Sequence, residues 1–339
     1  MSFTRFLGAT ARSMGALAGV MLMAQSASAQ VSDNWEEVVA AAKEEGRLNY
    51  YSVMVPAQND ALIRAFNEAY PEITVTVTRG ASELPARLAA EWQAGIDGAD
   101  VFSLADPVWF ATNADELLVL DTPHAPDFPA ENWAVPEKAP DLNYSPLGFL
   151  VWNTQRWPDG LSDWDDLLNP ELRGRIGTRE GMTATLAAFL EFITVELGEE
   201  YFQEIGKQDL KFYNSTLPLT QAVASGEVWV ANAGSLPTIR QLQEQGAPID
   251  FALPDPSFAN PQIGAALARS QRPNAAVVFM DFAMSPAGQQ AMNRGVAASA
   301  LSGLEDTMDV SGFRVFDPTR YTPEVREQWQ GTFDQYWRP

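Results

Sequence analysis

Two arginines and several hydroxyl or amide side chains follow predicted strands, where they could bind an anion. Arg79 follows the alternating run ITVTVT, and Arg179 lies in the strand-like segment RIGTRE. A guanidinium can make a bidentate contact with a carboxylate or phosphate. The polar residues near predicted helix N-termini are Ser82, Thr183, Asn214, Ser215 and Thr216. Backbone N–H groups and the helix dipole favour an anion there, although the same residue types are also favoured as plain helix caps.

The sequence has few of the residues that histidine- or cysteine-dependent catalysis and metal binding need. The chain has one histidine, His124, and no cysteine. A Ser-His-Asp hydrolase would need His124, which lies among prolines in TPHAPDFP and is expected to be an ordinary loop residue. Without cysteine there is no thiolate catalysis, zinc–cysteine site or iron–sulfur cluster. Four acids, Asp106, Asp163, Asp165 and Asp166, leave a secreted hydrolase with paired carboxylates as a minor alternative.

The charge is strongly acidic, with 44 Asp plus Glu against 22 Lys plus Arg and a net charge of −22. Nucleic acid is not expected as a partner, because binding it requires a basic face. The hydrophobic content of 46 % predicts a well-buried globular protein.

The first 29 residues have the pattern of a secretory signal peptide. Arg5 and Arg12 precede the apolar run Gly15 to Ala24, and small residues end at Ala29. We predict export with cleavage after Ala29. A membrane anchor is the alternative, but the second half of the uncharged stretch is polar, and a span needs about 20 mostly apolar residues. No later segment is long and apolar enough to span a bilayer.

Predicted strands and helices alternate along the rest of the chain, which indicates an α/β fold with largely parallel sheets. The rhythm breaks at the proline-rich stretch 121–147, expected to be a surface excursion, and restarts with a strand at 145–153. Two similar halves therefore predict two lobes. Ligands of such sheets bind beyond the carboxyl ends of the strands. The corresponding loops are 52–60, 79–83, 103–109, 177–184, 213–218 and 231–237.

Several segments resemble the extracellular solute-binding proteins of ABC importers, in the branch that includes the bacterial ferric-ion-binding proteins. These segments are WEEVVAAAKEEGRLNYYS (35–52), AFNEAYPEITVTVTRG (65–80), ADVFSLADP (99–107), WDDLLNPELRGRIG (164–177), ASGE (224–227) and NAAVVFMDFAMSPAGQQ (274–290). They follow the family order over nearly the whole chain after residue 29.

The resemblance implies a type 2 periplasmic-binding-protein fold, in which two α/β lobes, each a mostly parallel sheet flanked by helices, close on a solute. The chain would cross between lobes near 142–148 and return near 257–264. Lobe 1 is then predicted as 30–142 plus 264–339, and lobe 2 as 143–263. The implied partner is an ABC permease in the inner membrane, and the implied location is the periplasm. No catalysis and no cofactor are implied, and we predict a monomer.

The ferric members of the branch bind iron through a histidine or polar group after the first strand, a carboxylate after the third and paired tyrosines in the second lobe. Here the first loop, 52–56, has no histidine, the carboxylate position falls on Ala105, and 228–238 has no tyrosine. Ferric iron prefers phenolate and carboxylate oxygens. The resemblance therefore implies the fold without its iron site, and an atypical ferric site through waters, a bound anion or Asp106 stays the alternative.

We predict instead a small organic solute, with an anion as one candidate, and no metal. The predicted ligand-binding residues are Ser52, Met54, Arg79, Ser82, Ser103, Asp106, Tyr144, Arg179, Thr183, Asn214, Ser215, Thr216, Asn232 and Ser235. Met54, Trp109 and Tyr144 are expected to form apolar walls, although such residues more often belong to the core.

Overall fold

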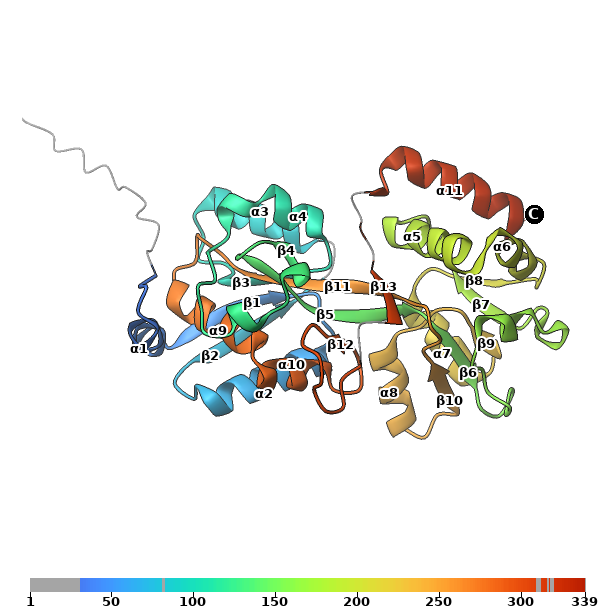
Figure 1. Cartoon of the computed structure of the whole chain (residues 1–339), viewed down its shortest axis with the longest axis horizontal. Coiled ribbons are helices and arrows are strands. Elements are labelled where there is room, and N and C mark those ends of the chain that lie inside the picture. The colour runs from blue at the N-terminus through green and yellow to red at the C-terminus, as the bar shows by residue number, and fades with distance from the viewer. Residues whose placement is uncertain (1–30, 81–82, 309–311, 316, 318–319, 339) are drawn as a thin grey trace, which may run out of the picture.

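The computed structural model describes residues 31–80, 83–308, 312–315, 317 and 320–338. The predicted signal peptide and Ser82 lie outside the described residues. The described chain folds into two α/β lobes that are joined by long strands (Figure 1).

Lobe 1 is built on a mixed sheet with the strand order β12-β5-β11-β3-β1-β2. Its strands are β1 (Arg47–Ser52), β2 (Thr74–Arg79), β3 (Val101–Leu104), β5 (Ala139–Gly148), β11 (Ser257–Ala266) and β12 (Ala298–Ser299). Two short strands lie beside this path, with β4 (Trp133–Val135) on β5 and β13 (Phe313–Val315) on β11. The helices are α1 (Trp35–Glu45), α2 (Pro56–Ala69), α3 (Leu84–Ala94), α4 (Pro107–Thr112), α9 (Pro273–Met284) and α10 (Pro286–Asn293).

Lobe 2 is built on a second mixed sheet with the order β10-β6-β9-β7-β8. Its strands are β6 (Leu150–Asn153), β7 (Ile176–Arg179), β8 (Lys211–Tyr213), β9 (Val230–Ala231) and β10 (Ile249–Ala252). Its helices are α5 (Ala184–Phe192), which continues as a π-helix over Ile193–Leu197, α6 (Glu199–Gly206), α7 (Thr216–Ser225) and α8 (Leu236–Glu244). Together the two sheets match the predicted alternation of strands and helices.

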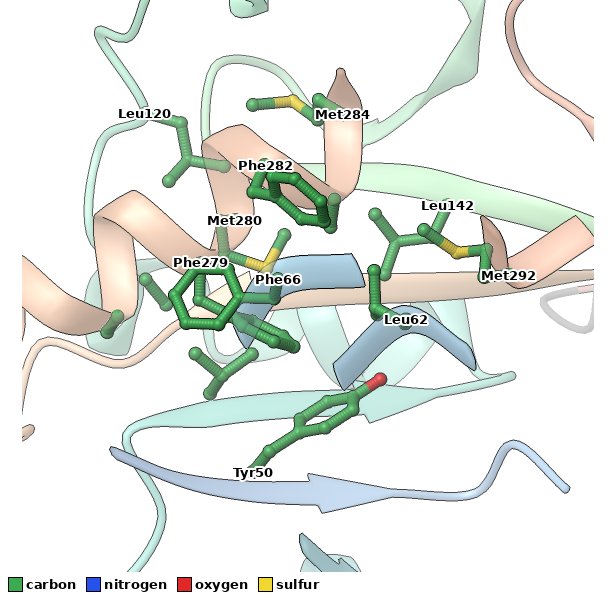
Figure 2. Packing of buried hydrophobic residues seen from close by; sticks show 14 of the residues in the cluster. Tyr50, Leu62, Phe66, Leu120, Leu142, Phe279, Met280, Phe282, Met284 and Met292 are labelled. Carbon is green, nitrogen blue, oxygen red and sulfur yellow. The ribbon is translucent and has the colours of Figure 1, made fainter. Parts of the chain in front are cut away.

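The largest core cluster lies in lobe 1, between the sheet and helices α2 and α9 (Figure 2). The Phe66 ring lies 5.0 Å from that of Phe279, which lies 5.1 Å from that of Tyr50. The segment 274–290, which carries part of the family resemblance, forms two helices that meet at Ser285. Because Pro286 has no N–H group, it starts a new helix, and the Ser285 hydroxyl accepts a hydrogen bond from the Gly288 N–H.

Two antiparallel strands connect the lobes. β5 is separated from β6 of lobe 2 by Phe149 alone, and β11 starts five residues after β10 ends. The two strands pair from Phe258 opposite Gly148 to Ile263 opposite Asp141. The predicted strand at 145–153 therefore begins earlier, at Ala139, inside the stretch expected to be a surface excursion. Pairing with β11, more than 100 residues later, outweighs the two prolines of this strand.

The last helix, α11 (Pro323–Tyr336), packs on lobe 2, whereas the predicted division placed it with lobe 1. The Trp337 ring is stacked 5.2 Å from Phe202 of α6, and its indole N–H donates to the Phe202 carbonyl. Phe333 lies 5.5 Å from Phe212 of β8. This correction follows from aromatic packing between residues more than 100 positions apart. The remaining lobe boundaries stay a prediction.

Candidate functional site

The carboxyl ends of the parallel strands in the two lobes face each other. β11 leaves lobe 2 at Ser257 and pairs antiparallel with β3, with Ile263 opposite Leu104. The end of β3, and of its parallel neighbours β1 and β2, therefore points towards lobe 2. In lobe 2, Ala231 at the end of β9 pairs with Val151 near the start of β6, which is the side towards lobe 1. The predicted strand-end loops thus lie along one interlobe cleft.

A cavity of about 120 Å³ lies in this cleft and is lined from both lobes and from the crossing strands. Three predicted residues line it, namely Met54 from lobe 1 and Thr216 and Ser235 from lobe 2. Three further polar residues line it that the sequence analysis missed, namely Gln58, Ser145 and Gln262. Gln58 lies in the first turn of α2, within the stretch 52–60 singled out as ligand-binding. Ser145 and Gln262 depend on the register of β5 against β11, for which the sequence carries no local signal.

On the lobe 1 edge, the predicted serines are used to hold the loop after β1. The Ser52 hydroxyl donates to Asn59 Oδ1 at 2.8 Å and lies 3.3 Å from the Ser103 hydroxyl. Asn59 Nδ2 donates to the Met54 carbonyl at 3.0 Å. All four residues are buried. Ser52 and Ser103 therefore support the loop that presents Met54, and their hydroxyls are not free for a solute.

Two charged residues lie at this edge. Asp106 caps α4, because its carboxylate accepts hydrogen bonds from the N–H groups of Val108 and Trp109. Arg79 is exposed, and its Nε donates to the Met54 carbonyl at 3.0 Å. No described carboxylate forms an ion pair with Arg79, so the rest of its guanidinium is open to a ligand.

The expectation that Tyr144 and Trp109 form cleft walls is wrong. Tyr144 is 3 % exposed, and its hydroxyl lies 2.8 Å from Asn132 Oδ1 and 2.9 Å from Asp141 Oδ2. Burial raises the pKa of Asp141 to about 6, partly offset by the hydrogen bond with Tyr144. Trp109 packs 4.6 Å from the ring of Phe102 in a second core cluster of lobe 1. Both side chains contribute to the core, as large aromatic residues commonly do.

On the lobe 2 edge, Arg179 ends β7 and has no described hydrogen-bond or ion-pair partner. The strand order places β7 between β8 and β9, whose following segments contribute Thr216 and Ser235 to the cavity. Arg179 therefore lies between two segments that line the cavity. Its guanidinium forms no hydrogen bond or ion pair with any described residue, and burial lowers its pKa to about 10. A partly buried cation without a partner is costly, and a bound anion would offset that cost.

Two buried polar side chains beside Arg179 also have no described partner. Asn232, directly after β9, is 1 % exposed, and neither its Nδ2 nor its Oδ1 makes a hydrogen bond with a described residue. The buried Thr178 hydroxyl on β7 likewise makes no hydrogen bond with a described residue. Native proteins satisfy the great majority of buried polar groups, so a bound ligand or ordered water is expected to bond to these atoms.

The other predicted residues of lobe 2 differ in their use. Thr183 caps α5, because its hydroxyl accepts a hydrogen bond from the Leu186 N–H. Ser215 occupies the N-cap position of α7 but makes no such bond, and Asn214 beside it is exposed. The hydroxyl of Ser235 accepts from Thr238. The start of α7 is therefore open to a ligand, whereas the start of α5 is already capped.

His124 lies away from the cleft and forms no part of it. Its Nδ1 is 2.9 Å from Asp281 Oδ2 in α9, and its backbone N–H donates to the same carboxylate. It holds the proline-rich loop onto lobe 1, as expected for an ordinary loop residue.

Larger cavities lie elsewhere in the described chain, and one of about 270 Å³ is lined by α5 of lobe 2 and by Arg314 and Val315 of β13. One of about 530 Å³ is lined by residues between Val119 and Glu137 in lobe 1. An open groove of about 920 Å³ is lined by residues between Trp152 and Pro170 in lobe 2. Among the described residues, no three His, Cys, Asp or Glu side chains are grouped so as to hold a metal ion. Nor does any described helix have the length and apolar character needed to cross a membrane.

Residues 50–295 match the family model described as bacterial extracellular solute-binding protein. A comparison with curated protein sequences gives no match.

Solved structures with this fold include three informative relatives. The substrate-binding protein of an ABC transporter from Agrobacterium tumefaciens superposes with a TM-score of 0.66 at 18 % identity, covering 86 % of this chain and 94 % of that one. AfuA from Actinobacillus pleuropneumoniae, solved with fructose-6-phosphate bound, gives 0.62 at 20 % identity over 87 % and 99 %. Iron-bound HitA from Pseudomonas aeruginosa gives 0.60 at 20 % identity over 83 % and 94 %. At these identities the likeness shows the two-lobed fold and leaves the ligand open.

Proposed function

Since the chain belongs to the bacterial extracellular solute-binding protein family, we propose that it captures a small organic anion in the cleft between its lobes. We propose further that it works in the periplasm as a monomer and delivers this solute to an ABC permease in the inner membrane. It is assigned no catalytic step and no cofactor.

The observation that carries the anionic ligand is the unpaired guanidinium of Arg179. It lies at the end of β7, between the segments that contribute Thr216 and Ser235 to the interlobe cavity. Asn232 and Thr178 add buried polar atoms without described partners, and the N-cap of α7 lacks a side-chain bond. An anion bound there would receive charge-assisted hydrogen bonds, which are about twice as strong as neutral ones.

The connections between the lobes support binding by closure. The cavity takes Met54 from one lobe, Ser235 from the other and Ser145 from the crossing strand β5. A solute between them would contact both lobes at once, which favours the closed arrangement by the difference in contacts.

The two alternative functions, ferric iron binding and hydrolysis, find less support. The cavity is lined by apolar, hydroxyl and amide side chains and by no carboxylate or phenol among the described residues, whereas ferric iron prefers those oxygens. Of the acids considered for a hydrolase, Asp163 and Asp166 form a capping box around the short helix Trp164–Leu168. They are used to hold that turn.

A thermal-shift screen of the protein without residues 1–29 tests the proposal. Organic carboxylates, phosphorylated sugars, neutral polyols and ferric salts are compared, because a ligand that binds only the folded state raises the melting temperature. We expect saturable, one-to-one binding of an organic anion that is lost in Arg179→Gln and kept in Arg64→Gln, which changes an exposed arginine on α2. A shift with ferric salts alone, or equal binding by Arg179→Gln, would overturn it.

A further inference from the structure

Two arginines end strands at the edges of the interlobe cleft, one in each lobe. Arg79 ends β2 of lobe 1, and its Nε donates a hydrogen bond to the carbonyl of Met54, which lines the cavity. Arg179 ends β7 of lobe 2, between the segments that carry Thr216 and Ser235. Neither arginine forms an ion pair with a described carboxylate, whereas most arginines of the described chain are paired or stacked on aromatic rings.

The acids nearest to Arg179 along the chain and across the sheet are already engaged. Glu180, the next residue, forms an ion pair with Arg338 at the end of the chain. Glu227 accepts a hydrogen bond from the Tyr213 hydroxyl, and Tyr213 pairs with Arg179 across β7 and β8. Neither of these two acids is therefore free to pair with Arg179.

Among the described residues, the wall of the interlobe cavity has no charged side chain. The cavity wall combines apolar side chains, such as Val53, Met54 and Leu236, with the neutral polar groups of Gln58, Gln262 and Thr216. Gln262 Oε1 is buried there without a described partner. The cavity has a volume of about 120 Å³ and is partly open, which suits a small solute. The wall thus suits a short, mainly apolar body with at most a few donors.

We propose that the solute is an organic dianion with an acidic group at each end of a short, mainly apolar chain. Arg179 binds one end and Arg79 binds the other. This inference rests on the proposed function and narrows its ligand class.

The arrangement also couples charge to closure. Without a ligand, closing the cleft brings two positive groups nearer to each other in a partly desolvated space, where like charges repel. A dianion replaces that repulsion by one attraction in each lobe, whereas a monoanion compensates only one guanidinium. A monoanion should therefore bind less tightly than a dianion and should hold the cleft closed less well.

Calorimetric titration of the protein without residues 1–29 tests this, using straight-chain diacids from succinate to pimelate, pentanoate as the monoacid and fructose 6-phosphate as the single phosphate. We expect one diacid to bind at least tenfold more tightly than pentanoate. Arg79→Gln and Arg179→Gln should each weaken that diacid at least tenfold. Pentanoate should lose affinity in Arg179→Gln and change less than about twofold in Arg79→Gln. The matched control is Arg47→Gln, at the opposite end of β1 and 3.6 Å from Asp97, which should leave every affinity unchanged.

The possible results distinguish failure of the dianion assignment from failure of the proposed anion-binding function. If fructose 6-phosphate or pentanoate binds as tightly as every diacid, or if Arg79→Gln leaves diacid binding intact, the dianion assignment is overturned while an anion-binding protein remains. If Arg179→Gln changes the binding of no anion, the proposed function fails as well. Small-angle scattering with and without the diacid reads closure independently, and an unchanged radius of gyration at saturation counts against the coupling.

Discussion

The strand ends of the two lobes are built from similar residues but use them differently. In lobe 1, Ser52, Asn59 and Ser103 bond to one another and to the Met54 loop, and Asp106 caps α4. In lobe 2, Arg179, Asn232 and Thr178 make no side-chain hydrogen bond with any described residue. The lobe 1 edge is stabilised by its own contacts, whereas the lobe 2 edge lacks partners that a solute would supply.

This difference separates stability from binding. Polar groups that are satisfied inside a protein contribute to its folding, and their loss destabilises it. Buried polar groups without partners cost stability in the free protein and recover that cost only when a ligand bonds to them. Substitutions at the two edges should therefore act in opposite directions on the free energy of unfolding.

The largest effect on the free energy of unfolding is expected at Asp141. Unlike the other lobe 1 residues compared above, it has a buried oxygen without a described partner. It is 9 % exposed, its Oδ1 has no described partner, and its folded-state pKa of about 6 lies above the ordinary 3.8. A raised pKa means that the folded state holds the proton more tightly. The stabilisation that protonated Asp141 gives the folded state is complete below about pH 4 and is lost as the pH rises through about 6. The free energy of unfolding should fall by up to about 3 kcal/mol over this range. Urea unfolding of wild type and Asp141→Asn between pH 4 and 8 should show curves that diverge over this range.

The Tyr144 hydroxyl sharpens the same test, because its hydrogen bond favours the charged form of Asp141. Tyr144→Phe should therefore move the pH dependence of the wild type to higher pH. Parallel curves for wild type and Asp141→Asn at every pH would show that Asp141 has an ordinary pKa.

An intermediate effect is expected at Asn59 on the lobe 1 edge. Asn59→Leu removes two buried hydrogen bonds, those with Ser52 and with the Met54 carbonyl. The free energy of unfolding should fall by about 2 kcal/mol, measured by urea denaturation. Asn67→Leu, at an exposed position of the same helix, is the matched control and should change it by less than about 0.5 kcal/mol. Equal effects of the two substitutions would contradict the comparison.

The smallest effect, and one of opposite sign, is expected at Asn232. Asn232→Leu removes a buried amide that has no described partner, so the free protein should gain about 1 kcal/mol of stability. Solute affinity should fall about tenfold, which is the value of one hydrogen bond at about 1.4 kcal/mol.

Asn153 provides the control for that prediction within lobe 2. It is also buried, but its Nδ2 donates to the Val223 and Ala224 carbonyls and its Oδ1 accepts from two backbone N–H groups. Asn153→Leu should destabilise the protein and leave solute affinity unchanged. If Asn232→Leu destabilised it by a similar amount, Asn232 would be a structural residue like Asn153.

Most elements near the cleft could be predicted because their signals are local. The alternating run after residue 73 forms β2, and Gly46 ends the first helix in the left-handed conformation. The rule that ligands lie beyond the carboxyl ends of strands led to the loops that carry Met54, Thr216 and Ser235. Local signals failed where distant pairing decides, as at Ala139, where β5 begins, and at α11, which packs on lobe 2.

The site itself was predicted only in part. Residue type marked Arg79 and Arg179 as anion ligands, but the same reasoning selected Ser52, Ser103 and Tyr144, whose hydroxyls are used internally. The partners of these hydroxyls include Asn59 in a helix and Asn132 in the proline-rich loop. No spacing in the sequence announces those contacts.

The sequence by itself determined the α/β alternation, the family likeness and the positions of polar residues at strand ends, because hydrophobic period, caps and turns act over a few neighbouring residues. Only the tertiary structure decided which of those polar groups remain free to bind. That depends on partners brought from distant parts of the chain by packing, and a hydrogen bond forms only between groups that the fold places within about 3 Å of each other.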